Sequence, residues 1–106
     1  MSVIMTLRAK GDPNELERRA VGNPDAVRAI SDRAKQHGLI AHRFYGSDDG
    51  QIMVVDEWPD QKSFQGFFAE ARSEIEPLMR EVGVTSEPEV TFWRKLDSHD
   101  EVGWGA

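Results

Sequence analysis

Residues 51–68 read QIMVVDEWPDQKSFQGFF, and they contain the clearest structural signal in the chain. The first part is rich in Ile, Val and Trp, which is typical of a β-strand. Pro59 then breaks the strand, and Asp60 is a residue type that caps helices. From residue 61 onward, apolar side chains recur at helical spacing, which predicts an amphipathic helix. A strand is therefore expected to lead almost directly into a helix that packs on the sheet.

Strand and helix signals elsewhere in the chain complete the pattern. Strand formers cluster in three further segments, at residues 3–7, 39–45 and 89–96. Helical periodicity marks three segments, at residues 14–20, 24–36 and 61–82. Apart from the short first helix, the order is strand–helix–strand–strand–helix–strand, the split βαβ arrangement of a ferredoxin-like α+β domain. We expect one domain over 1–96, with a four-stranded antiparallel sheet, and a tail over 97–106.

Residue types at the helix ends support these boundaries. Asn23 can cap the second helix, and Pro24 suits its first position. Gly38 can end that helix because glycine adopts positive φ without strain. Pro77 lies inside the third helix, where its missing amide donor predicts a kink or a break.

The strands at 39–45 and 51–58 are predicted to form a hairpin through the turn Ser-Asp-Asp-Gly at 47–50. We pair Gly46 with Gln51. One face then carries Leu39, Ala41, Arg43, Tyr45, Ile52, Val54, Asp56 and Trp58. The other face carries Ile40, His42, Phe44, Met53, Val55 and Glu57. Both faces are substantially apolar, although a sheet with helices on one side usually has a polar second face.

A second copy of the chain is the simplest cover for the other face, so we expect a homodimer. The alternative is a single domain whose second face is covered by its own tail, with Trp104 as the plug.

Length and composition exclude several classes of protein. The chain has 106 residues, a net charge of −6 and no basic stripe, which argues against nucleic acid and anionic membranes as partners. It has no cysteine, so disulfides, thiolate metal sites and cysteine nucleophiles are excluded. No segment approaches the roughly 20 apolar residues of a membrane span, and we recognise no signal peptide. The expected location is the cytoplasm.

In these features the chain resembles the dimeric α/β-barrel superfamily, and within it the antibiotic-biosynthesis-monooxygenase-like proteins. The resemblance covers residues 3–96 and rests mainly on VVDEWPDQKSFQGFF at 54–68. The family pattern of an acidic residue, a tryptophan, a helix cap and an aromatic is matched by Asp56, Trp58, Asp60 and Phe64. It implies a barrel made by two copies and a small organic ligand. It also implies oxidation by dioxygen without a cofactor or metal, because a carbanion-forming substrate supplies the electrons.

The chain also departs from the enzymes of this family. Its oxygenases place an asparagine where this sequence has Val54, and a tyrosine where it has Phe64. Haem-degrading members need a histidine near the middle of the helix at 61–82, which has none. The alternative function is therefore a non-catalytic dimeric module that binds a ligand or a partner protein.

The residue types at the end of the hairpin indicate candidate roles. His42 is the histidine best placed to act as a general base near neutral pH, with Glu57 diagonally across the hairpin to orient its ring. A structural His–Glu pair in the dimer interface is the alternative. Trp58 and Phe64 are predicted to wall a pocket; the alternative for Trp58 is a core residue whose N–H meets a backbone acceptor.

Two polar candidates share the predicted Trp58 face. Arg43 and Asp56 would give the pocket polarity, with Arg43 holding a substrate carboxylate or an oxyanion. They are equally interpreted as an ion pair that fixes the sheet. Tyr45 would add a phenol donor, or face solvent. The three histidines do not form a recognisable metal-binding set.

Overall fold

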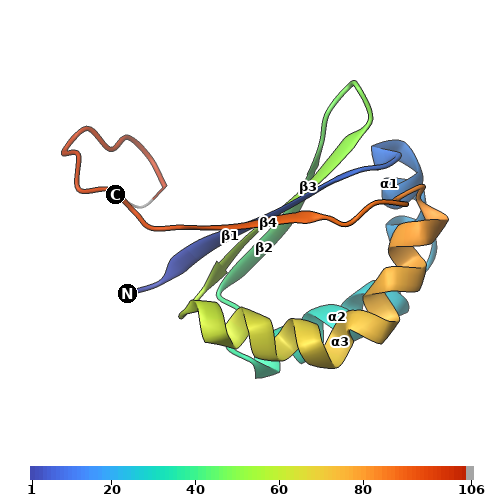
Figure 1. Ribbon diagram of the computed structural model, residues 1–106, viewed down its shortest axis with the longest axis horizontal. Coiled ribbons are helices and arrows are strands. Elements are labelled where there is room, and N and C mark those ends of the chain that lie inside the picture. Colours follow the sequence, from blue (N-terminus) through green and yellow to red (C-terminus); the bar gives the residue numbers. More distant parts are fainter. Residues whose placement is uncertain (105–106) are drawn as a thin grey trace.

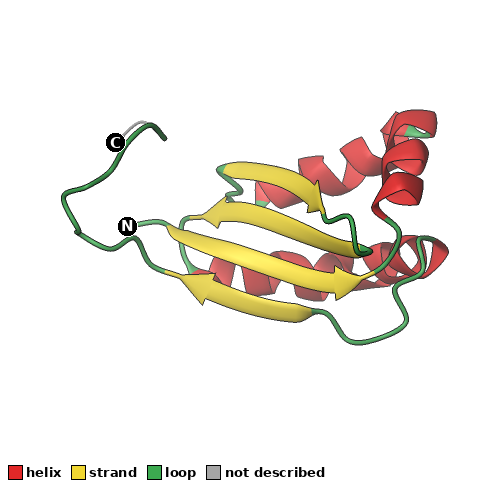
Figure 2. Ribbon diagram, turned by 90° about the horizontal axis from the view of Figure 1, so that it is seen from above, coloured by secondary structure: helices red, strands yellow, loops and turns green. Residues whose placement is uncertain are grey.

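The computed structural model describes residues 1–104. Four strands form one antiparallel sheet in the order β2-β3-β1-β4. The elements are β1 (Val3–Lys10), α1 (Pro13–Gly22), α2 (Pro24–Gln36), β2 (Ala41–Gly46), β3 (Gln51–Trp58), α3 (Gln61–Glu81) and β4 (Glu89–Trp93). Helices α2 and α3 lie along one face of the sheet, and α1 lies at one end (Figure 1). Seen from above, the sheet lies in front and these helices lie behind it (Figure 2). The predicted ferredoxin-like α+β fold is confirmed.

Helix α2 and strand β3 have the predicted bounds, and the other elements differ by a few residues; strand β1 continues to Lys10 rather than ending at residue 7. Strand β2 begins at Ala41 rather than at residue 39. The Leu39 amide donates to the Ala34 carbonyl at 3.1 Å, so residue 39 is part of the turn that follows α2 rather than of the strand. Strand β4 ends at Trp93 rather than at residue 96.

Side-chain caps begin two of the helices. Asp12 Oδ1 accepts the amides of Asn14 and Glu15 at 3.0 and 3.2 Å, and Asp60 Oδ1 accepts the Ser63 amide at 2.8 Å. The predicted cap by Asn23 is wrong, because its side chain makes no cap hydrogen bond. Its backbone N–H instead ends α1, since the two helices adjoin at this residue.

Helix α3 runs unbroken through Pro77, so the predicted break is wrong. Figure 1 shows that the second half of α3 bends toward the sheet, which agrees with the predicted kink. The bend carries the end of α3 to the loop at residues 82–88. Val82 and Val84 in this loop are buried against Ala9 and Ile52.

The larger hydrophobic core lies between the sheet and helices α2 and α3. Trp58 is at its centre and is fully buried. Its buried members are Met5, Leu7, Ala34, Val54, Trp58, Phe64, Phe67 and Ala71. Three of these are aromatic, and the rings of Trp58, Phe64 and Phe67 pack against one another with centroids 5.5 to 6.5 Å apart.

Strands β2 and β3 pair one residue away from the predicted register. Gly46 faces Ile52 rather than Gln51. The Ser47 amide donates to the Gln51 carbonyl at 2.9 Å and closes a three-residue loop, in which Gly50 has a φ of 85°. Because side chains alternate along a strand, this shift moves every β2 side chain to the opposite face of the sheet. His42 therefore faces the helices.

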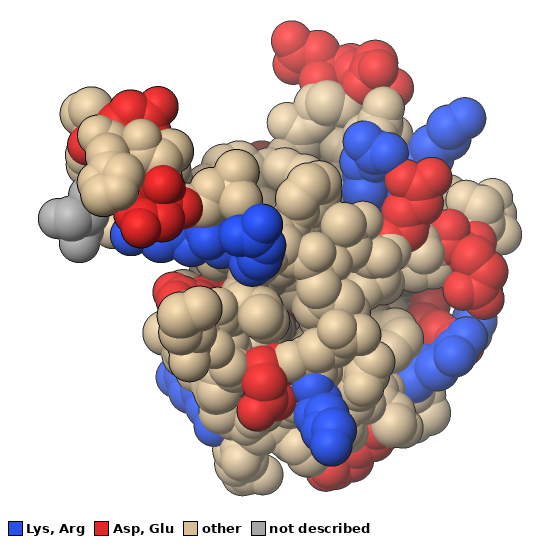
Figure 3. Space-filling view, turned by 60° about the vertical axis from the view of Figure 1, so that its left-hand side comes forward, with Lys and Arg blue, Asp and Glu red and all other residues tan. Residues whose placement is uncertain are grey.

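The other face of the sheet, which we call the open face, carries no helix of residues 1–104. Trp93 and Tyr45 lie on it and are 53% and 41% exposed. The described part of the tail stands away from the body (Figure 3). Trp104 approaches Arg43 at 5.9 Å but stays 90% exposed, so within this chain it does not plug the open face.

None of the helices among residues 1–104 combines the length and the apolar character needed to cross a membrane.

Candidate functional site

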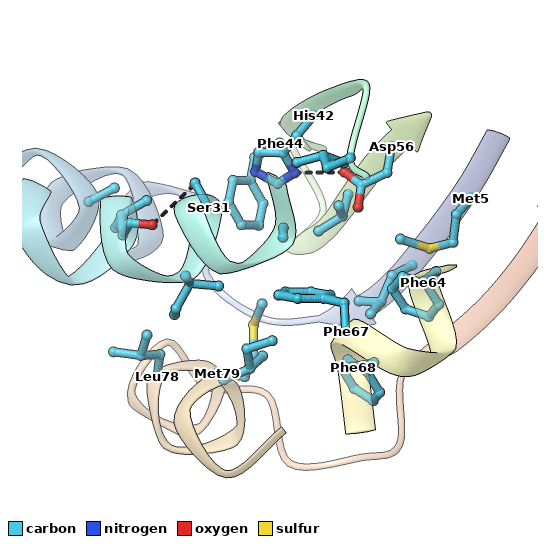
Figure 4. Close-up of a pocket in the computed structure, with 18 of the residues that line it drawn as sticks. Met5, Ser31, His42, Phe44, Asp56, Phe64, Phe67, Phe68, Leu78 and Met79 are labelled. Atoms are coloured by element: carbon cyan, nitrogen blue, oxygen red, sulfur yellow. Dashed lines mark hydrogen bonds and ion pairs between the residues drawn. The ribbon is translucent and has the colours of Figure 1, made fainter. Parts of the chain in front are cut away.

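A cavity of about 130 Å³ lies between the sheet and helices α2 and α3. Its walls are almost entirely apolar, as Figure 4 shows. The side chains that line it are Met5, Leu7, Leu16, Ala20, Val27, Ile30, Ser31, Ala34, Leu39, His42, Phe44, Val54, Asp56, Phe64, Phe67, Phe68, Ile75, Leu78 and Met79. The Ser31 hydroxyl donates to the Val27 carbonyl at 3.1 Å, so it is already used within α2. The remaining polar groups on the wall are the side chains of His42 and Asp56.

His42 and Asp56 face each other across the β2–β3 ladder. His42 Nδ1 lies 2.7 Å from Asp56 Oδ1, and the dashed line at the top of Figure 4 marks this contact. A carboxylate can only accept, so we assign the ring proton to Nδ1. Nε2 is then left as the basic nitrogen of the ring. This is the relation in which an aspartate orients a histidine that acts as a general base.

Trp58 holds the other oxygen of the same carboxylate. Its Nε1 donates to Asp56 Oδ2 at 3.1 Å. Asp56 is 5% exposed, so a carboxylate with both oxygens bonded fits its surroundings. Trp58 does not line the cavity; it lies behind the wall and positions Asp56. The prediction that Trp58 walls the pocket is wrong, and its N–H meets a side chain rather than the backbone.

Aromatic rings enclose the pair. Phe44 packs edge-on against the His42 ring, with centroids 5.0 Å apart and an angle of 84°. Phe64 lines the cavity as predicted and also packs against Trp58, with centroids 5.7 Å apart. Phe67 lies on the opposite wall, below the His42 ring in Figure 4. Neither Phe44 nor Phe67 was predicted to line a pocket, although Phe67 lies in the predicted amphipathic helix at 61–82.

Arg43 and Tyr45 do not belong to this cavity. The register places both on the open face, where Arg43 Nη1 donates to Tyr45 Oη at 3.3 Å. The prediction that Arg43 shares a face with Asp56 and Trp58 is therefore wrong. Glu57 is on the open face as well and accepts from the Ser2 hydroxyl, so it does not orient His42. One change in loop length explains all of these differences.

The other two histidines lie away from the cavity. His37 Nε2 lies 2.7 Å from Glu70 Oε2, between the end of α2 and α3. His99 is in the tail, 3.4 Å from Asp97. Within residues 1–104, no three His, Asp or Glu side chains converge in a way that would hold a metal ion.

Solved structures with this fold include several oxygenase-like proteins. A putative antibiotic biosynthesis monooxygenase from Bordetella bronchiseptica has a TM-score of 0.66 at 17% identity, over 90% of this chain and 97% of its own. SnoaB, a cofactor-independent oxygenase from Streptomyces nogalater, has a TM-score of 0.63 at 16% identity, over 94% of this chain and 98% of its own. A dimeric ferredoxin-like protein from an uncultured marine organism has a TM-score of 0.64 at 15% identity, over 95% and 93%.

These likenesses show the ferredoxin-like fold, and their identities are too low to carry an activity. No protein-family model matches the sequence, and no curated protein matches it.

Proposed function

We propose that the chain forms a homodimer, binds a small aromatic molecule in the cavity and promotes its oxidation by dioxygen, with His42 as the base. The observation that carries the proposal is the His42–Asp56 pair, a histidine oriented by a buried carboxylate on an otherwise apolar wall. In an otherwise apolar cavity, such a pair can exchange a proton with the ligand atom that contacts it.

The cavity fits one aromatic ring beside His42. Its volume of about 130 Å³ is close to that of the engineered apolar cavity of ~150 Å³ that binds benzene. The walls offer aromatic rings for stacking. A phenol, a quinol or an aromatic ketone with an acidic methylene group combines such a ring with a proton that a histidine can remove.

The reaction balances with the substrate as the electron donor. His42 Nε2 takes a proton from the acidic methylene carbon and leaves a carbanion. The carbanion transfers its electrons to dioxygen, a C–O bond forms, and the resulting peroxide takes the proton back from the imidazolium. Loss of water breaks the O–O bond and leaves a ketone. One oxygen atom enters the product and the other leaves as water, with both methylene hydrogens.

The dimer is proposed from the open face. It carries Ile4, Thr6, Ala41, Arg43, Tyr45, Met53, Val55, Thr91 and Trp93 in adjacent rows, with Glu57 and the Arg8–Glu89 ion pair on the same face. Apolar side chains such as Trp93 and Tyr45 stay partly exposed there. A second copy that packs on this face through a two-fold axis would bury them, and one solved protein of this fold is described as dimeric.

Oxygen consumption with 2-indanone tests the activity, because this molecule has one aromatic ring and its methylene groups, between the ring and the carbonyl, are acidic. We expect the protein to accelerate 2-indanone oxidation, and His42→Ala to lower the rate by about 100-fold or more. The matched control is His37→Ala, which removes a histidine that does not line the cavity. Equal rates for the protein and for buffer alone would overturn the catalytic proposal.

A non-catalytic ligand-binding role is the second candidate. The cavity wall carries Val54 and Phe64 where oxygenases resembling this chain place polar residues, so it offers few groups to stabilise a developing charge. Quenching of tryptophan fluorescence by aromatic ligands, together with no oxygen uptake, would support this role.

A further inference from the structure

A second cavity lies beside α3, beneath the loop at residues 82–88. Its volume is about 460 Å³. The lining residues are Leu7, Ala9, Phe68, Arg72, Ile75, Glu76, Met79, Arg80, Val84, Thr85, Ser86, Glu87 and Pro88. It therefore combines an apolar floor with a rim of charged and hydroxyl side chains, unlike the first cavity.

The two cavities are neighbours. Leu7, Phe68, Ile75 and Met79 line both of them, so a single layer of side chains separates the two spaces. Three of these residues lie on the sheet-facing side of α3. All four are apolar, and a methionine adapts its shape easily to what it contacts. A ligand with one ring beside His42 has its nearest further space beyond this layer.

Size also favours a ligand that uses both spaces. Ligand pockets usually measure about 300–1,000 Å³. The first cavity, at about 130 Å³, is below that range, whereas the second, at about 460 Å³, is within it. A molecule of several fused rings therefore needs the second cavity.

The two arginines on the rim differ in whether a carboxylate pairs with them. Phe68, Arg72, Glu76 and Arg80 follow one another at four-residue spacing and form one ridge of α3. Arg72 hydrogen-bonds Glu76 and lies 3.5 Å from Glu87. The Arg72 hydrogen bond holds the pKa of Glu76 below its usual value, and the charge of Arg80 adds to this. Within residues 1–104, no carboxylate lies within 4.0 Å of the Arg80 guanidinium.

We propose that the second cavity binds the carboxylate of an extended aromatic acid through Arg80, while the far ring of the same molecule lies beside His42. The inference rests on the proposed function and names its substrate class. A guanidinium binds a carboxylate through two parallel hydrogen bonds, and the Thr85 and Ser86 hydroxyls are further donors on the rim. Arg72 is already neutralised by two glutamates, so Arg80 provides the free positive charge.

Binding of anthracene-2-carboxylate and of anthracene-2-carboxamide, followed by fluorescence, tests the proposal. The two probes have the same rings and differ in charge. We expect the unmodified protein to bind the carboxylate about tenfold more tightly, as one charge-assisted hydrogen bond predicts. Arg80→Gln is expected to abolish this preference and to leave carboxamide binding unchanged. The control Arg28→Gln removes an exposed arginine of α2 that lines neither cavity, and it is expected to keep the preference.

The outcomes separate this inference from the proposed function. Equal affinity of the unmodified protein for the two probes, or a preference that survives Arg80→Gln, overturns the role of Arg80 and leaves the His42 cavity in place. Failure to bind either probe overturns this inference, whereas the proposed function is overturned separately, by the absence of accelerated oxygen uptake with a one-ring substrate. If both proposals are correct, the His42→Ala variant loses oxygen uptake and still binds the carboxylate probe more tightly than the carboxamide probe.

Discussion

His42 Nδ1 lies 2.7 Å from Asp56 Oδ1, and the residues belong to adjacent strands with paired backbones. Backbone pairing fixes the separation of their Cα atoms, so the side-chain contact needs little further ordering. The indole of Trp58 holds the second carboxylate oxygen at 3.1 Å. The basic nitrogen is therefore aimed by a chain of two hydrogen bonds that begins in the fully buried core.

Asp56→Asn is expected to lower oxygen uptake with 2-indanone by about 100- to 10,000-fold, the range that a general base contributes. The amide has the same shape, but its NH₂ group can donate to Nδ1 and move the ring proton to Nε2, where no base remains. Binding of anthracene-2-carboxylate is expected to be retained, since Arg80 and the rings are unchanged. A variant with normal melting temperature and normal oxygen uptake would contradict the assigned role of Asp56.

Trp58→Phe is expected to lower the free energy of unfolding by roughly 1–3 kcal/mol, because Asp56 Oδ2 loses its donor inside the core. Urea unfolding followed by circular dichroism measures this change. The control is Trp104→Phe, which changes an indole that is 90% exposed. Equal losses in the two variants would show that the hydrogen bond to Asp56 contributes nothing beyond ring size.

The fold could be predicted from the sequence because the spacing of apolar residues and the positions of helix caps and prolines indicate the same elements. The segment at 51–68 formed β3 and α3 as predicted, with Asp60 as the cap. Its strand ended at Trp58, where Pro59 cannot continue the ladder. Local signals of this kind do not depend on how distant segments pair, so they can be interpreted directly.

The site was predicted in part because it depends on one loop. Asp56 and Phe64 line the cavity as expected, whereas all three β2 candidates, His42, Arg43 and Tyr45, were predicted on the opposite face of the sheet. Both faces of β2 carry apolar side chains, so the pattern did not choose between two registers. A glycine at the last loop position is typical of a three-residue hairpin loop with a bulge, so Gly50 in the sequence favoured the observed pairing. In the structure it has the positive φ that this loop requires.

Asp60→Asn is expected to reduce the loss of stability in acid. The Ser63 amide, and then its hydroxyl, hydrogen-bond the Asp60 carboxylate and hold its pKa below the usual value. This stabilisation is complete above the unfolded-state pKa of about 3.9, and it is lost as the pH falls through the folded-state pKa. Asparagine also caps helices but does not titrate. The difference in melting temperature between the two proteins should shrink as the pH is lowered from neutral to acidic. A difference that stays constant with pH would contradict the prediction.

Gly46→Ala is expected to destabilise the protein by about 1–3 kcal/mol, the usual cost of overpacking. A Cβ atom at this position would lie 2.5 Å from Cβ of Pro13, the first residue of α1, so the helix would have to shift. Gly22→Ala is the matched control, because a Cβ there meets nothing within 4 Å. That variant is expected to gain about 0.4–1 kcal/mol through the unfolded state. Urea unfolding separates the two, and equal effects would show that Pro13 moves without cost.

Val55→Lys is expected to convert the proposed dimer to a monomer without unfolding it. Val55 lies between Arg43 and Thr6 on the open face, where a lysine meets solvent in the single chain. In the dimer, the same ammonium group would be buried with its symmetry mate, and the loss of hydration has no compensating partner. Light scattering should show the mass fall from twice 12.0 kDa to 12.0 kDa. Glu17→Lys places a lysine on α1, away from this face, and should remain dimeric. A Val55→Lys variant that keeps the doubled mass would place the dimer interface elsewhere on the chain.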